Sequence, residues 1–178
     1  MTPTILVLLG GLGILLVGVG LLGTLLGLRA ANASFSNIET GLIMAGYYAG
    51  YIAGTLLAPR IIRNVGHIRC FAAFAALAAA TSLCFGLIIE PWTWLALRVV
   101  SGACIVGVYM VVESWLNEQS STPARGQVFA VYMMSTLIAL GSGQFLLLAG
   151  DSSQLDLFAL AAILISIGVV PIAVTRLT

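Results

Sequence analysis

Residues 5–28 read ILVLLGGLGILLVGVGLLGTLLGL, a stretch in which no side chain is charged. A helix of about 20 apolar residues is long enough to cross the ~30 Å hydrocarbon core of a bilayer. The stretch is too long for the core of a typical secretion signal, and no basic residue precedes it. We therefore expect it to be the first membrane span.

The composition extends this expectation to the whole chain. Of the 178 residues, 61% are hydrophobic and 7% are charged, and the mean hydropathy is +1.14. A soluble domain carries roughly 25% charged residues. The net charge of +1 argues against binding to nucleic acid, which needs clustered cations. The sequence predicts an all-α integral membrane protein in a lipid bilayer, with a single six-helix domain over 1–178 and helices near 5–28, 41–57, 70–89, 92–116, 128–149 and 157–174.

The arginines divide the loops into two groups. One group holds Arg60, Arg63, Arg69, Arg125 and Arg176. The other holds Arg29 together with Glu39, Glu90, Asp151 and Asp156. Cytoplasmic loops of membrane proteins carry an excess of basic residues. We therefore expect a multi-pass protein of the inner (plasma) membrane with both termini in the cytoplasm.

Glycines repeat at helical spacing within the apolar runs. Gly46, Gly50 and Gly54 share one helix face, and Gly102 and Gly107 lie in the fourth run. Small residues at this spacing let two helix backbones approach closely. The pattern fits static packing and also fits contacts that let helices rock, and it does not distinguish the two.

The segment from Gly54 to Arg69, GTLLAPRIIRNVGHIR, resembles the cytoplasmic signature between the second and third helices of the major facilitator superfamily. Arg63, Gly66 and Arg69 fall at matching places. The acidic residue of the family signature is absent, since Ile61 or Ile62 stands there. The resemblance implies an inner gate, without the usual salt bridge to the other half of the transporter. The alternative is a plain positively charged loop.

Two further stretches resemble elements of the same family. Arg98 followed by Gly102 resembles an Arg-x-x-x-Gly element, which implies a part in proton coupling or substrate binding. The alternative is that Arg98 extends to the outer membrane interface. Glu113, with Arg125 and Gly126 after it, resembles the family's inner-end element. We expect Glu113 to pair with an arginine of an inner loop, as part of the gate or as a structural clamp.

Several polar side chains in the apolar runs are candidates for a solute pathway. They are Tyr47, Tyr51, Tyr109 and Gln144, in addition to Arg98. The alternative for the tyrosines is anchoring at the membrane interface. Cys70, Cys84 and Cys104 form no CxxC pair and are expected to be packing residues. With no nucleotide loop, metal-ligand cluster or catalytic triad in the sequence, we expect no enzyme activity, cofactor or metal.

Together these matching stretches cover the chain, and their combination resembles a bacterial YcaD-like branch of the superfamily. They imply the N-terminal six-helix half of the superfamily fold, built from 3+3 inverted repeats. The implied function is secondary transport of a small solute by alternating access. That function needs a second six-helix bundle, which could come from another chain, from a second copy of this chain or from a part of the protein outside this sequence. The alternative is a non-transporting membrane subunit that packs against a larger complex.

Overall fold

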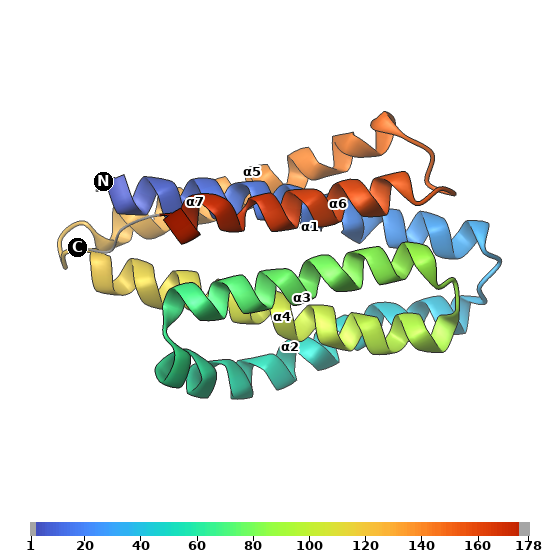
Figure 1. The fold of residues 1–178 in the computed structure, drawn as a ribbon, viewed down its shortest axis with the longest axis horizontal. Helices are drawn as coiled ribbons and strands as arrows, with labels where there is room; N and C mark the ends of the chain where they lie inside the picture. Colours follow the sequence, from blue (N-terminus) through green and yellow to red (C-terminus); the bar gives the residue numbers. More distant parts are fainter. Residues whose placement is uncertain (1–2, 175–178) are drawn as a thin grey trace.

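The computed structural model describes residues 3–174, and every regular element within them is a helix (Figure 1). The helices are α1 Pro3–Asn32, α2 Asn37–Val65, α3 His67–Leu87, α4 Pro91–Gln119, α5 Arg125–Phe145, the 3-10 helix η1 Leu146–Ala149, α6 Asp156–Ile167 and α7 Val169–Val174. Six spans among the described residues are long and apolar enough to cross a membrane, counting α5 with η1 and α6 with α7 as one span each. The expected six-helix, all-α membrane fold is confirmed.

The connections between helices gather at the two ends of the bundle (Figure 1). The end where α2 meets α3 and α4 leads into α5 carries Arg60, Arg63, Arg69 and Arg125. We call it the arginine-rich end. The opposite end, which we call the acidic end, carries Arg29, Glu39, Glu90, Asp151 and Asp156. Arg176 lies outside the described residues.

The second helix extends beyond the range predicted from the sequence. The sequence predicts a helix end near Pro59 and a basic loop up to Arg69, but α2 passes through Pro59 to Val65. A proline inside a helix removes one backbone hydrogen bond. Here the continued helix buries Ala58 and Ile62 against the core, which offsets that loss. A single residue, Gly66 with φ 91°, separates α2 from α3.

Side chains at the acidic end cap two of the helices. Ser36 and Glu39 form a reciprocal capping box at the start of α2. At the start of α4, the Glu90 carboxylate accepts hydrogen bonds from the backbone N–H groups of Trp92 and Thr93, at 3.0 Å and 2.6 Å. A hydrogen bond from the Thr93 side chain, together with these two backbone bonds, lowers the pKa of Glu90 below its ordinary value. The cap fixes where α4 begins.

The helices pack in two interlocked triplets. Helix α1 packs mainly on α5 and α6, whereas α4 packs mainly on α2 and α3, and α3 contacts α6. Exchanging helices 1–3 with helices 4–6 leaves this pattern of contacts unchanged. The pattern is that of half a major facilitator fold with two repeats of three helices.

Glycine contacts at two helix crossings follow the same exchange of helices 1–3 with helices 4–6. Each of four glycines lies against a backbone carbonyl of the neighbouring helix, so close that a Cβ atom would overlap it. At the α2–α4 crossing the pairs are Gly50 with Val99 and Gly102 with Tyr47. At the α1–α5 crossing they are Gly143 with Val17 and Gly20 with Leu140. On every one of these helices the glycine and the contacted carbonyl are three residues apart, so the two crossings are equivalent.

The other glycines assigned to packing also lie at helix contacts. A Cβ atom on Gly46 would lie 2.7 Å from the Leu95 side chain, and one on Gly107 would lie 2.6 Å from the Phe74 ring. Gly46 therefore brings α2 close to α4, and Gly107 brings α3 close to α4.

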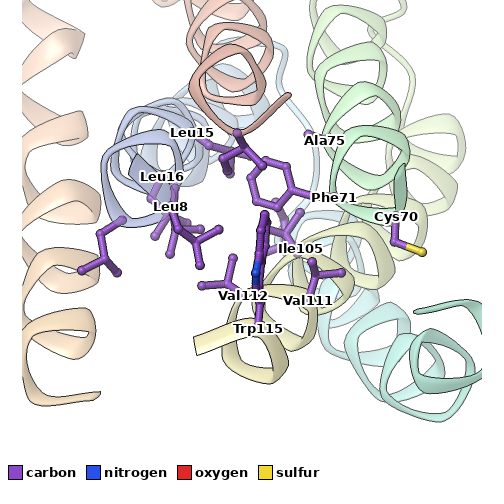
Figure 2. Packing of buried hydrophobic residues seen from close by; sticks show 14 of the residues in the cluster. Leu8, Leu15, Leu16, Cys70, Phe71, Ala75, Ile105, Val111, Val112 and Trp115 are labelled. Atoms are coloured by element: carbon purple, nitrogen blue, oxygen red, sulfur yellow. The ribbon is translucent and has the colours of Figure 1, made fainter. Parts of the chain in front are cut away.

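Two hydrophobic clusters fill the bundle. The larger lies toward the arginine-rich end, where Phe71 of α3 and Trp115 of α4 meet the leucines of α1 (Figure 2). The smaller lies toward the acidic end and surrounds Trp94, whose indole N–H donates to the carbonyl of Ile88 at 2.8 Å. Apolar side chains therefore pack both ends of the bundle.

Candidate functional site

A cavity of about 340 Å³ lies in the middle of the bundle and extends toward the acidic end. Its polar lining consists of Thr24, Tyr47, Tyr48, Arg98, Ser101 and Gln144. The rest of the wall is apolar or small, and includes Leu22, Ile105, Leu140 and Ile165. All six membrane spans contribute to the cavity wall. Helix α3 contributes Ala78, and each of the other five contributes a polar or large apolar side chain. We call this space the Arg98 cavity.

Arg98 is the charged residue of the cavity lining. It lies about 10 Å along α4 from Pro91, at the helical rise of 1.5 Å per residue. Its Nη2 atom is 3.9 Å from the sulfur of Met44, and its guanidinium carbon is 4.5 Å from the centre of the Tyr47 ring. Its Nε atom is buried and has no hydrogen-bond partner among the described residues. The guanidinium therefore has spare hydrogen-bonding capacity inside the bundle.

The position of Tyr47 depends on its neighbours in α2. Gly46 lets α2 approach the backbone of α4 near Arg98. The Tyr47 ring also contacts the rings of Tyr48 and Tyr51, with centroids 5.6 Å and 6.1 Å away. A cation over an aromatic face is attracted by the ring quadrupole. Tyr47 thus holds the arginine within the cavity without neutralising its charge.

The structure separates the five residues that the sequence suggested for a solute pathway. Arg98, Tyr47 and Gln144 line the Arg98 cavity, whereas Tyr51 and Tyr109 lie nearer the arginine-rich end and do not line it. Sequence reasoning missed Thr24 and Ser101. Thr24 is the one hydroxyl-bearing side chain within residues 5–28, and this isolation was a signal that could have found it.

The segment that resembles the cytoplasmic signature of the family lines part of a second cavity of about 510 Å³ at the arginine-rich end. Arg63 and Gly66 line it with His67, Ser114 and Glu118. The Nε2 atom of His67 is 3.1 Å from the Ser114 hydroxyl and 3.6 Å from a carboxylate oxygen of Glu118. These contacts join the α2–α3 junction to the end of α4.

Three other residues singled out in the sequence motifs do not line this cavity. Arg69 and Arg125 are exposed at the arginine-rich end. Gly54 lies deeper, against Ala103 and Val106 of α4.

Glu113 differs from the sequence-based expectation. We expected an ion pair with an arginine of an inner loop, but no such pair occurs among residues 3–174. Instead, the Tyr132 hydroxyl donates a hydrogen bond to the Glu113 carboxylate, with 2.8 Å between the oxygens. Tyr132 is 2% exposed, and a buried tyrosine hydroxyl requires a partner. The buried Tyr132 hydroxyl on α5 needs a hydrogen-bond acceptor, and Glu113 supplies it instead of pairing with an arginine.

Comparison with known proteins agrees with this geometry. The profile of the family described as "Sugar (and other) transporter" matches residues 19–172. The chain is 30% identical over 99% of its length to a protein of Escherichia fergusonii called "Uncharacterized MFS-type transporter YcaD". It is also 30% identical, over 98% of its length, to the protein of that name in Escherichia coli O9:H4 strain HS.

The chain spans about half the length of these curated relatives, 46% in both cases. No solved structure matches it. The family match, the similarity along nearly the whole chain and the two interlocked helix triplets lead to one conclusion: the chain belongs to the major facilitator superfamily of membrane transporters.

Proposed function

We propose that this chain forms one of the two six-helix bundles of a secondary transporter, which moves a small solute across the plasma membrane by alternating access. The observation that carries the proposal is the Arg98 cavity, which holds a charged side chain at membrane depth. Charged residues within membrane spans are costly and usually mark a substrate or ion pathway. A purely structural bundle has no need of such a cavity.

Exposed side chains support the need for a second bundle. Tyr48, which is 67% exposed, and the exposed Thr24 and Gln144 place polar groups at the rim of the cavity. Next to this rim, α2 and α5 expose large apolar side chains such as Ile52 and Leu137. A partner made of membrane helices would cover the apolar faces and enclose the polar rim at once, whereas lipid tails would leave the rim without hydrogen bonds.

The charge distribution supports an orientation. The arginine-rich end would face the cytoplasm, and the acidic end would face the other side of the membrane. Both chain termini would then be cytoplasmic. The Arg98 cavity, which extends toward the acidic end, would be nearer the outer surface.

Uptake into proteoliposomes tests the proposal, with the purified protein reconstituted at a density that pairs two copies or together with the membrane partner that co-purifies with it. The solutes would be radiolabelled glucose, choline and benzoate, which represent neutral, cationic and anionic classes. We expect uptake of one class above that of protein-free vesicles, and loss of that uptake in Arg98→Ala with the protein still in the membrane. Arg29→Ala is the matched control, since it removes an arginine outside the cavity. If none of the three moves, the transporter proposal fails and the alternative of a non-transporting subunit gains support.

A further inference from the structure

The Arg98 cavity has an unbalanced charge. Arg98 contributes a positive charge to its wall, and no acidic side chain among the described residues lines it. The other polar groups are hydroxyls and one amide, which carry no formal charge. Because ions are far more costly to bury when they are unpaired, the cavity favours an occupant that brings a negative charge.

The acidic side chains of α4 cannot supply that charge. Glu90 lies about 12 Å before Arg98 along the helix axis, and Glu113 lies about 22 Å after it. Glu90 already accepts hydrogen bonds at the start of α4, and Glu113 already accepts one from Tyr132. Both carboxylates are engaged elsewhere. Glu118, about 30 Å beyond Arg98 along the axis, lies beside His67, so the guanidinium has no anionic partner in its own helix.

The immediate contacts of Arg98 leave room for an anion. Neither the Met44 sulfur nor the Tyr47 ring neutralises a cation. The buried Nε of Arg98 retains a donor without an acceptor. A guanidinium offers parallel N–H donors that match the two oxygens of a carboxylate. The hydroxyls of Tyr47, Tyr48 and Thr24 and the amide of Gln144 are further donors around the same space.

The size of the Arg98 cavity and its apolar wall narrow the class of solute further. A volume of about 340 Å³ is at the lower end of ligand pockets, which run from about 300 to 1,000 Å³. Leu22, Ile105, Leu140 and Ile165 offer apolar surface to the body of the solute. A single arginine balances a single negative charge. On these grounds we infer that the solute is a small organic monocarboxylate with an apolar body, held by Arg98. This inference rests on the proposed function and specifies its substrate class.

Thermal unfolding of the purified protein, followed by tryptophan fluorescence, tests the inference in the absence of transport. Benzoate and isovalerate are the probes, and their neutral amides, benzamide and isovaleramide, are matched controls of nearly the same shape. A ligand that binds only the native state raises the unfolding midpoint with increasing concentration. We expect a saturable rise with at least one carboxylate and none with its amide. Lack of a shift with both carboxylates, or equal shifts with the amides, would overturn the inference.

Three variants assign any shift to the arginine. Arg98→Gln should abolish it, and Arg98→Lys, which keeps the charge but loses the planar fork, should retain part of it. Arg29→Gln removes a cation outside the cavity and should leave the shift unchanged. An undiminished benzoate shift in Arg98→Gln would contradict the inference. If the proteoliposomes take up glucose or choline but no benzoate, the proposed function survives and this substrate class does not.

Discussion

The guanidinium carbon of Arg98 lies 4.5 Å from the centre of the Tyr47 ring, so a residue of α4 packs over the ring of a residue of α2 inside the bundle. The contact fixes the arginine at the wall of the cavity while its charge stays available to a ligand. It also means that the closest aromatic neighbour of the charge lies on a different helix. Any change in the α2–α4 crossing would therefore move the two groups relative to each other.

The first prediction separates the ring of Tyr47 from its hydroxyl. Tyr47→Phe keeps the aromatic face over Arg98, whereas Tyr47→Leu removes it. A cation–π contact contributes about 0.5–2 kcal/mol, so Tyr47→Leu should weaken benzoate binding about 2- to 30-fold. Tyr47→Phe should weaken it less. Titration of the unfolding midpoint with benzoate measures both, and equal losses in the two variants would show that the ring face does not hold the arginine.

The second prediction concerns the α2–α4 crossing. Gly50→Ala places a methyl group against the Val99 carbonyl, and overpacking of this kind costs about 1–3 kcal/mol. Gly50→Leu should disrupt the packing further. Gly41→Ala is the matched control on the same helix, since nothing lies within 4 Å of its Cβ position, and it should be neutral or stabilising. Unfolding midpoints in detergent provide the comparison, and a Gly50→Ala protein as stable as the Gly41→Ala protein would argue against a tight crossing.

The third prediction follows from the equivalence of the two crossings. Gly143→Ala should destabilise the protein about as much as Gly50→Ala, because Gly143 meets the Val17 carbonyl as Gly50 meets that of Val99. The same unfolding measurement applies, with Gly141→Ala as the control on α5, where the Cβ position is open. A Gly143→Ala protein of unchanged stability would mean that only one crossing is tightly packed.

The fourth prediction concerns the buried hydroxyl of Tyr132. Glu113→Leu leaves that hydroxyl without its acceptor, which should cost about 1–3 kcal/mol. Adding Tyr132→Phe to Glu113→Leu removes the unpaired group and should recover most of the loss. A double-mutant cycle on unfolding midpoints measures this coupling. Additive effects of the two substitutions would show that the hydrogen bond contributes nothing to stability.

The fifth prediction concerns orientation. In a protein whose native cysteines are replaced by alanine, a cysteine at Asp151 should react with a membrane-impermeant maleimide added to cells from the periplasmic side. A cysteine at Asn64 should not react, because the arginine-rich end is proposed to face the cytoplasm. Both positions are exposed at the surface of the protein, so burial does not bias the comparison. Labelling at Asn64 but not at Asp151 would show that the protein has the opposite orientation.

The spans were predictable because each depends on a local property of the sequence. A long apolar run such as residues 5–28 has few alternatives to a helix in a bilayer. The end of α2 was not predictable from the same information. Pro59 is a strong local signal for a helix end, but the burial of Ala58 and Ile62 on other helices outweighs it. That burial is a tertiary effect, which the local sequence does not contain.

The candidate site was only partly predictable for a similar reason. Arg98 was evident as a charge within an apolar run, and its cavity-lining position follows from the cost of burying it in lipid. The tyrosines were not separable by sequence, since Tyr47 and Tyr51 differ by one helical turn and only Tyr47 lines the cavity. The pairing of Glu113 with Tyr132 depends on where α5 lies against α4. Neither detail is encoded in spacing along one helix.

The glycine crossings have a consequence for how the surface of this bundle can vary. Hydrophobic attraction does little to hold helices together in lipid, because lipid tails are as apolar as leucine. Glycine Cα–H groups next to carbonyl oxygens form weak hydrogen bonds of about 0.5–1 kcal/mol each, and these involve backbone atoms alone. The four glycine–carbonyl contacts therefore hold α2 to α4 and α1 to α5 without the help of the outward-facing side chains. Those side chains on α2 and α5 can change to suit different neighbours while the interior of the bundle keeps its shape.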